Sequence, residues 1–242
     1  MNSISEVDES RRQFLLYLLS TGAFAAIPGC SSTVQTTPGI PTEMPTGRSI
    51  YELDGDVRVN GLPATLQTLI RLGDKVETGE KSYVIFAVNK DAFILRSSGM
   101  MTFPEPVTSP TIKPTAFSLD RGKALSVLAS RNTRIATPNA VVGIRGTGVY
   151  LETTPELSYV CTCYGVADLA TSDDPGINET IESEHHDAPR YILADTNVKN
   201  RIQPAPFINH DDQELLLIET LVGRSPPYSV PKSVTRTRTQ YR

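Results

Sequence analysis

The chain has 242 residues and a net charge of −4, so it can bury one good hydrophobic core with appendages, or two small ones. Neither the net charge nor the spread of Lys and Arg gives the basic surface that nucleic-acid binding needs, which excludes nucleic acid as the expected partner. Eighteen prolines, sixteen glycines and the absence of tryptophan favour a turn-rich, mostly β chain over a helical bundle.

The first thirty residues have the pattern of a bacterial export signal. Arg11 and Arg12 precede an apolar run at 16–27, and a small-residue end follows at Pro28-Gly29-Cys30. The paired arginines followed by Phe-Leu resemble a twin-arginine signal, which exports folded proteins, but two n-region arginines would serve general secretion equally well. Cys30 resembles a lipobox cysteine, which is diacylated and becomes the mature N-terminus. The alternative is an ordinary signal peptide or an uncleaved anchor.

This signal predicts a periplasmic protein that a lipid anchors to the membrane. Ser31 directly after Cys30 favours the outer membrane, by resemblance to enterobacterial lipoproteins. Residues 31–49 are rich in Thr, Ser and Pro and have almost no large apolar side chain, so we expect a tether between the anchor and the folded part.

The folded part is expected to begin at about residue 50 with short strands and tight turns. A near-continuous run of hydrophobic residues at 83–88 and 92–95, separated by a turn at 89–91, predicts a hairpin with at least one strand covered on both faces. A Pro-rich crossing at 103–114 should run over the surface. Further strands are expected on either side of a turn at 120–123.

The stretch 137–152, TPNAVVGIRGTGVYLE, interleaves glycines with β-branched residues, which predicts a bulged β-hairpin in the core. Arg145 lies between two of the glycines, where its planar guanidinium can donate to carbonyls or to a carboxylate across the bend. We interpret Gly143, Arg145, Gly146 and Thr147 as a structural clamp, with a ligand site as the alternative. The glycines lack the strand-to-helix context of a nucleotide site.

Several weak motifs occur here in one order. They are 57–61, Gly73-Asp74 with 76–79, Ser82 with the hairpin at 84–95, the turn at Gly122, and 135–147. This order resembles the FecR-type periplasmic domain of the iron-dicitrate regulator family, over about residues 53–153. The resemblance implies an all-β, sandwich- or roll-like domain, which we place at 50–153.

Members of that family often control an extracytoplasmic-function sigma factor through a cytoplasmic segment. Only about ten residues precede the export signal in this sequence, so we do not expect sigma-factor regulation. The resemblance then implies a periplasmic recognition or scaffold module whose partner is another envelope protein.

Residues 154–224 form an extension that carries cysteine and histidine. In a strand expected at 159–166, Cys161 and Cys163 project from one face and Thr162 from the other. Two Cys and two His could make a tetrahedral zinc site, and thiolate with imidazole also suits copper or iron. The candidate ligands are Cys161, Cys163, His185 or His186, and His210 or Asp187. The alternatives are a disulfide, redox chemistry, or buried thiols without a ligand.

The end of this extension predicts a helix that packs on the β domain, with docking of a partner as the alternative. Acidic residues at 211–214 suit its N-terminus, with Asn209 or Asp211 as cap, and Gly223 should end it. Residues 225–242 read as a basic tail. No hydrolytic motif or phosphate loop occurs, so the sequence predicts a non-enzymatic sensor or accessory module that binds a partner or ligand. The competing class is a metal- or redox-cofactor protein.

Overall fold

The computed structural model describes residues 43–105, 114–129 and 132–229. The export signal with Arg11 and Arg12, Cys30, residues 31–42 of the tether, most of the Pro-rich crossing and the end of the basic tail lie outside these ranges. What the sequence predicts for them therefore stays a prediction. Within the described ranges, no helix combines the length and the hydrophobicity that a membrane span requires.

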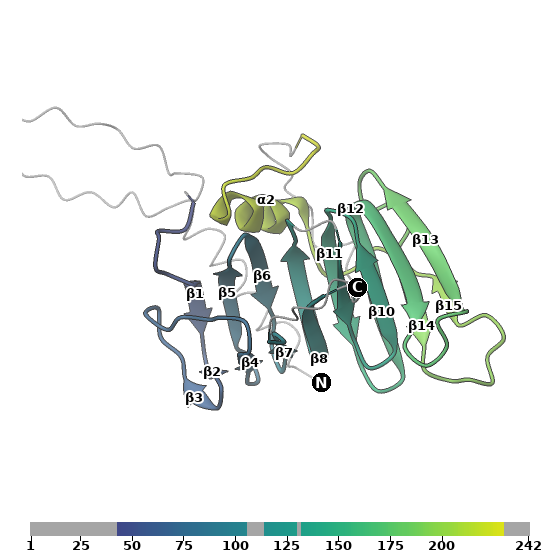
Figure 1. Ribbon diagram of the computed structural model, residues 1–242, viewed down its shortest axis with the longest axis horizontal. Coiled ribbons are helices and arrows are strands. Elements are labelled where there is room, and N and C mark those ends of the chain that lie inside the picture. Colours follow the sequence, from purple (N-terminus) through teal and green to yellow (C-terminus); the bar gives the residue numbers. More distant parts are fainter. Residues whose placement is uncertain (1–42, 106–113, 130–131, 230–242) are drawn as a thin grey trace, which may run out of the picture. The chain divides into compact units, whose positions relative to one another are not determined.

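The described residues fold into two β-sheets that share two long strands, and one C-terminal helix accompanies them (Figure 1). This confirms the predicted all-β class. The first sheet holds β1 (Ile50–Asp54), β5 (Tyr83–Val88), β6 (Asp91–Leu95), β11 (Gly148–Thr153), β14 (Arg190–Leu193) and β15 (Ile202–Pro204). The second holds β2 (Val57–Val59), β3 (Leu62–Pro63), β4 (Lys75–Thr78), β7 (Met100–Thr102), β9 (Thr133–Ala136), β10 (Ala140–Ile144) and β13 (Asn178–Ser183). The shared strands are β8 (Thr115–Val127) and β12 (Leu157–Thr171).

The two shared strands pass from one sheet to the other because each bends at a glycine. Gly122 in β8 has φ 89° and Gly165 in β12 has φ 88°, a backbone conformation that is unfavourable for other residues. Before Gly165, β12 pairs with β11 and β14; from Gly165 onward it pairs with β10 and β13. In the same way β8 leaves β7 and β9 and joins β6 and β11. The glycines therefore set the corners of the fold.

The predicted turn at 120–123 and the predicted hairpin at 137–152 are both wrong, because at each place the chain passes from one sheet to the other without reversing its direction. Residues 120–123 lie inside β8 and do not separate two strands. The stretch 137–152 is not a hairpin either, since β10 and β11 both pair antiparallel with β12, one after the other. It is one arm of a longer hairpin whose turn lies at 154–156. Glycine with positive φ serves a turn and a corner equally well, so the local pattern could not distinguish them.

The strand β13 lies in the acidic segment 171–184, which contains few apolar residues. Only Ile181 and Ser183 of this strand are buried, and its other residues are exposed or half-buried. The strand pairs with β12 alone among the described strands, at an edge of the second sheet. An edge strand with so few apolar residues lacks the alternation that identifies strands in a sequence.

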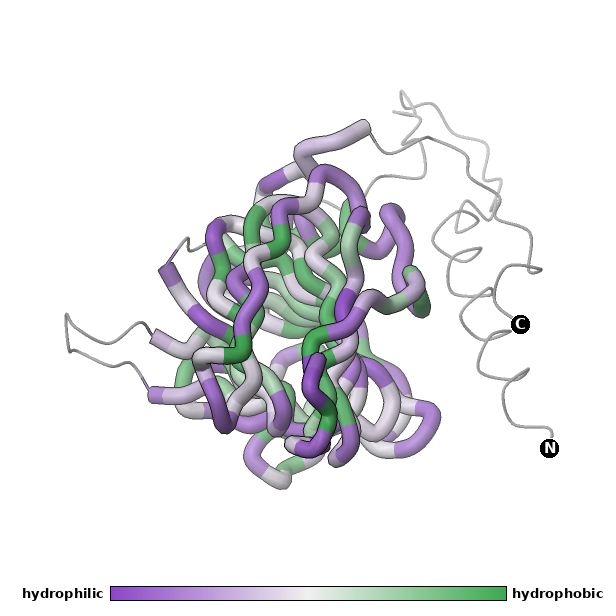
Figure 2. Tube along the Cα trace, turned by 90° about the vertical axis from the view of Figure 1, so that its right-hand side faces the viewer, coloured by the Kyte–Doolittle hydropathy of each residue, from purple (hydrophilic) through white to green (hydrophobic). Residues whose placement is uncertain are grey.

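The core contains a cluster of four phenylalanine rings from the two sheets and the loop after β7. Phe86, Phe93, Phe103 and Phe117 are each at most 2% exposed, and their neighbouring ring centroids lie 5.1–6.3 Å apart. The predicted hairpin at 83–95 is confirmed as β5 and β6, and both strands are almost entirely buried. In Figure 2 the hydrophobic positions gather in the interior and the hydrophilic ones on the loops at its margin.

The predicted extension at 154–224 is continuous with the sheets that precede it. Its first strand, β12, pairs along its whole length with β10 and β11. Apolar residues from both sides of the predicted boundary, such as Leu151, Val160 and Ile192, belong to one hydrophobic cluster. The candidate metal ligands at 161–210 are thus held by the main core.

The predicted helix is confirmed as α2 (Asp212–Leu221). Asp211 is its N-cap and forms a capping box with Glu214, and Gly223, with φ 71°, follows its end. The helix contacts β6 and β8 and lies across the ends of the strands (Figure 1). The Arg96 guanidinium donates to both carboxylate oxygens of Glu214, each at 2.9 Å. These contacts fix the first turn of α2 beside the sheet.

Candidate metal centre

The two cysteines lie on the same face of β12 and are completely buried. Both are free. Residues i and i+2 of an extended strand lie about 6.6 Å apart. A disulfide needs β-carbons about 3.8 Å apart, so a bond between Cys161 and Cys163 would require the strand to bend. β12 therefore holds two adjacent thiols that are directed to one point without being joined.

The loop between β13 and β14 brings His186 to these thiols. Asp187 shapes the loop, because its carboxylate accepts the backbone N–H groups of Glu184 at 2.8 Å and His185 at 3.0 Å. His186 has a left-handed backbone, φ 57°, and its N–H donates to the carbonyl of Cys163 at 3.0 Å. Its ring Nδ1 then lies 3.6 Å from the Sγ of Cys161.

His210 reaches the same point from the segment before α2. The preceding Asn209 has φ 59°, and its side-chain amide donates to Glu152 of β11 at 2.6 Å. The His210 ring stacks on Tyr150 of β11, with 4.3 Å between the ring centroids and 17° between the planes. Its Nε2 lies 3.1 Å from Nδ1 of His186. Three separate parts of the chain thus meet at one buried point.

The convergent set is Cys161, Cys163, His186 and His210, whose donor atoms all lie within 4.8 Å of one another. With ordinary zinc bond lengths, a tetrahedral ion would place its sulfur and nitrogen ligands about 3.6 Å apart and its two nitrogens about 3.3 Å apart. The corresponding distances are 3.6 Å and 3.1 Å. Cys161, His186 and His210 therefore already have two of the separations of a tetrahedral site, and Cys163 lies within 4.8 Å of each of them.

The hydrogen bonds around the two rings leave one contact without a proton. His210 Nδ1 lies 2.7 Å from the carbonyl oxygen of Ile208, and His186 Nε2 lies 3.1 Å from a carboxylate oxygen of Asp212. Both partners are acceptors, so both of these nitrogens must carry protons, which leaves two bare nitrogens 3.1 Å apart between the rings. Two neutral imidazoles have only two protons for these three contacts. A metal ion between the rings, or a proton given up by the neighbouring Cys161 thiol, would fill this gap.

The two thiols differ in how readily they lose their protons. The hydrogen bond from Cys163, assisted by His186 and His210, lowers the pKa of the Cys161 thiol to about 4 against the opposing effect of burial. Burial raises the pKa of the Cys163 thiol well above its usual value, and the nearby Cys161 sulfur adds to this. The pair thus holds one proton firmly and one weakly. A bound cation would stabilise both thiolates.

A second group, partly exposed, adjoins the buried one. It consists of His185, His186 and Asp212, whose donor atoms also lie within 4.8 Å of one another. Nε2 of His185 lies 2.8 Å from the Asp212 oxygen that also contacts His186. The sequence indicated Asp212 only as an acidic residue of the helix N-terminus. Its place beside the histidines depends on where α2 docks, and no local signal shows that.

The other predicted ligands and the predicted clamp lie elsewhere. Asp187 serves the loop backbone and is not in the convergent set. Arg145 pairs with Asp168 of β12 at 2.8 Å, and its side chain is 59% exposed. Gly143 faces the same Asp168 across the sheet, Gly146 has φ 74°, and Thr147 is buried. Arg145 therefore lies on the surface at the corner between β10 and β11.

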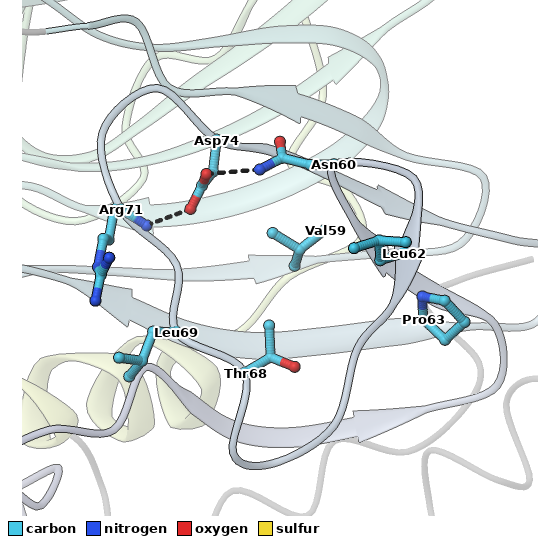
Figure 3. A pocket seen from close by; sticks show the side chains of 8 residues that line it. All are labelled: Val59, Asn60, Leu62, Pro63, Thr68, Leu69, Arg71 and Asp74. Atoms are coloured by element: carbon cyan, nitrogen blue, oxygen red, sulfur yellow. Dashed lines mark hydrogen bonds between the residues drawn. The ribbon is translucent and has the colours of Figure 1, made fainter.

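A surface groove of ≈ 390 Å³ lies apart in the chain from these residues, at the β2–β3 end of the second sheet (Figure 3). The carboxylate of Asp74 organises it by accepting the side-chain amide of Asn60 and the backbone N–H of Arg71, each at 2.7 Å. Leu62 and Leu69 line the groove, and Leu62 is 72% exposed. The groove holds no cysteine or histidine.

The comparisons with known proteins leave the family open. No protein-family profile matches the chain, and no curated protein matches it. Two crystal structures of a "putative anti-sigma factor" from Parabacteroides distasonis, at 1.65 and 2.50 Å resolution, resemble it with a TM-score of 0.42 and 13% sequence identity. The match covers 54% of this chain and 58% of that protein. A likeness at this level carries no argument about function.

Proposed function

We propose that this protein binds one transition-metal ion, zinc in the first place, through Cys161, Cys163, His186 and His210. The observation that carries the proposal is the convergence of two sulfur and two nitrogen donor atoms from three parts of the chain within 4.8 Å of one another, with two of their separations at tetrahedral values. The shortage of one proton between the two rings supports it independently.

The donor set also defines the kind of site. Four protein ligands complete a tetrahedron and leave no position for water or substrate, which is typical of structural and regulatory zinc sites. Two thiolates and two imidazoles suit Zn²⁺ best, and Cu⁺ and iron are the other ions that such ligands accept. The ion would join β12, the loop at 184–187 and the segment before α2. We therefore propose a non-enzymatic role for the ion.

Metal analysis of the purified protein tests this proposal. The wild type, reconstituted with Zn²⁺ and freed of excess, is expected to hold one ion per chain, and a Cys161→Ser/Cys163→Ser variant none. Thr162→Ser is the matched control, because Thr162 lies on the same strand with its side chain on the opposite face. If the wild type retains no ion although it and the control variant are folded, the proposal is overturned.

The cellular setting belongs to the same proposal. The export signal with Arg11 and Arg12 and the lipobox-like Cys30 support a periplasmic, lipid-anchored protein. Twin-arginine export of the folded chain would allow the ion to be inserted first. Labelling cells with a radioactive fatty acid tests the anchor: the wild type should be labelled and Cys30→Ser should not. Equal labelling of the two would exclude Cys30 as the lipidated residue.

A second candidate function is the binding of an envelope protein that presents an apolar segment. The supporting observation is four exposed leucines within eleven residues, Leu62 in β3 and Leu66, Leu69 and Leu72 in the loop after it, of which Leu62 and Leu69 line the groove. Apolar side chains that gather on a surface mark interaction sites. Capture from envelope extracts should be lost in Leu62→Asp/Leu69→Asp and kept in the double cysteine variant. Equal capture by both variants would contradict a role for this loop.

A further inference from the structure

We propose that His185 and Asp212 form a solvent-facing capture site, which takes up the incoming metal ion and passes it through His186 to the buried centre. This inference rests on the proposed metal centre and adds a second binding site to it. The ligand class is a hydrated divalent transition-metal ion, for which imidazole nitrogen and carboxylate oxygen are ordinary ligands.

The two groups of donors differ in their access to water. The side chain of His185 is 45% exposed and that of Asp212 is 16% exposed. Those of the inner donors are almost or completely buried, with 7% exposure for His186, 2% for His210 and none for the two cysteines. An ion that arrives from solvent therefore meets His185 and Asp212 before it meets any thiol.

Aromatic rings restrict other approaches to the buried donors. Tyr150 stacks on His210, and Phe207 contacts both inner rings, with centroid distances of 4.7 Å to His186 and 4.6 Å to His210. Tyr228, from the segment after α2, lies against His185 at 4.4 Å and more loosely against His186 at 6.4 Å. The exposed imidazole thus lies at the margin of an otherwise apolar cover.

His186 connects the two groups because its two ring nitrogens face opposite ways. Nε2 lies 3.1 Å from Asp212, and Nδ1 faces the sulfur of Cys161 and the ring of His210. The neutral ring has one proton, which must be on the nitrogen that does not hold the ion. With the ion on Nε2, the proton is on Nδ1 and His210 accepts it. When the ion moves to Nδ1, that nitrogen gives its proton to solvent and Nε2 takes up a proton from solvent, which Asp212 accepts.

Transfer inward is favoured because the inner ligands bind more strongly. At the outer site the ion has at most two imidazoles and one carboxylate and keeps some of its water. At the inner site it gains two thiolates, while the remaining thiol protons and its last waters go to solvent. No oxidant or reductant is needed, and the charge of the ion is unchanged.

The test measures how fast Co²⁺ binds to the metal-free protein, using the absorption that thiolate-bound cobalt acquires in a tetrahedral site. His185→Ala should slow binding by about tenfold, because the local ion concentration near the centre falls. His185→Asp, which keeps a metal ligand, should restore most of the rate. The control is Glu184→Gln, which removes an exposed charge next to His185 but no proposed ligand.

The equilibrium affinity distinguishes capture from ligation. A capture site lies on the path in both directions, so His185→Ala should slow the release of Co²⁺ to a chelator by the same factor and leave the dissociation constant unchanged. Unchanged rates, or a loss of affinity that matches the loss of rate, would overturn the inference while the centre itself stands. Absence of cobalt binding in the wild type would instead overturn the proposed function on which the inference rests.

Discussion

His186 and Asp212 lie 3.1 Å apart, from Nε2 to Oδ1, although 26 residues separate them in the chain. The contact joins the loop after β13 to the first residue of α2. It directs the opposite nitrogen of His186 toward Cys161 and His210. A carboxylate that accepts the second N–H of a histidine in this way fixes the ring and raises its basicity as a metal ligand.

Asp212→Asn should therefore lower the affinity for Zn²⁺ by roughly 10- to 100-fold. The four inner donors remain in this variant, so it should still bind one ion when zinc is in excess. Competition with a chromophoric chelator measures the affinity. Glu182→Gln, which removes an exposed charge of β13, is the control for a general electrostatic effect. Equal losses in the two variants would contradict a specific role for Asp212.

Removal of the metal should destabilise the fold. Free zinc at a hundred times its dissociation constant stabilises a protein by about 2.7 kcal/mol, which corresponds to roughly 5 to 10 °C in Tm for a domain of this size. Calorimetry with and without a chelator checks this. The Cys161→Ser/Cys163→Ser variant should melt at one temperature under both conditions, and a chelator-dependent shift in that variant would show that its effect is unrelated to the site.

Gly165→Ala should cost more stability than Gly61→Ala. Both glycines have positive φ, 88° and 78°, so alanine at either position adds about 1 to 2 kcal/mol of backbone strain. A β-carbon at Gly165 would also lie 2.7 Å from the carbonyl oxygen of Gly146 and 2.7 Å from a methyl group of Thr147, whereas Gly61 has open space. We expect at least about 1 kcal/mol of additional loss for Gly165→Ala in urea unfolding. Equal losses in the two variants would mean that the backbone around Gly165 moves enough to accommodate the β-carbon.

Arg145→Ala should lower the free energy of unfolding by less than about 1 kcal/mol, because its ion pair with Asp168 is exposed. Arg201→Ala is the comparison. The Arg201 side chain is 4% exposed and donates to the carbonyls of Leu193 and Ala194 and to both carboxylate oxygens of Asp173. Its loss should cost about 2 kcal/mol or more, since polar groups lose their partners. A loss of unfolding free energy clearly above about 1 kcal/mol for Arg145→Ala would support the structural clamp that the sequence predicts.

Unchanged stability of Arg145→Ala together with lost partner binding would have a different meaning. It would favour the alternative that the corner between β10 and β11 is a recognition site. The same urea unfolding series and a capture experiment with envelope extract separate these outcomes. The leucine-loop variant serves as the reference for lost capture.

Local patterns were sufficient for features that depend on neighbours in the chain. Two near-continuous apolar runs around a turn identified the hairpin of β5 and β6. Period-two alternation placed Cys161 and Cys163 on one face, because successive side chains of a strand always alternate. The N-cap residue and the spacing of apolar residues identified α2. The capping box between Asp211 and Glu214 lies within its first turn. Each of these features needs only a few consecutive residues.

Features that depend on long-range pairing were decided by the tertiary structure. The sequence left open whether His210 or Asp187 would join the cysteines, and the structure brings in His210, 24 residues from His186, because α2 and the segment before it dock on the sheets. Gly122 was expected in a turn and Gly165 within a strand, yet both are corners, because the partner strands of β8 and β12 change at these points. Residue type and spacing determined which side chains could bind a metal, and packing between distant segments decided which of them meet.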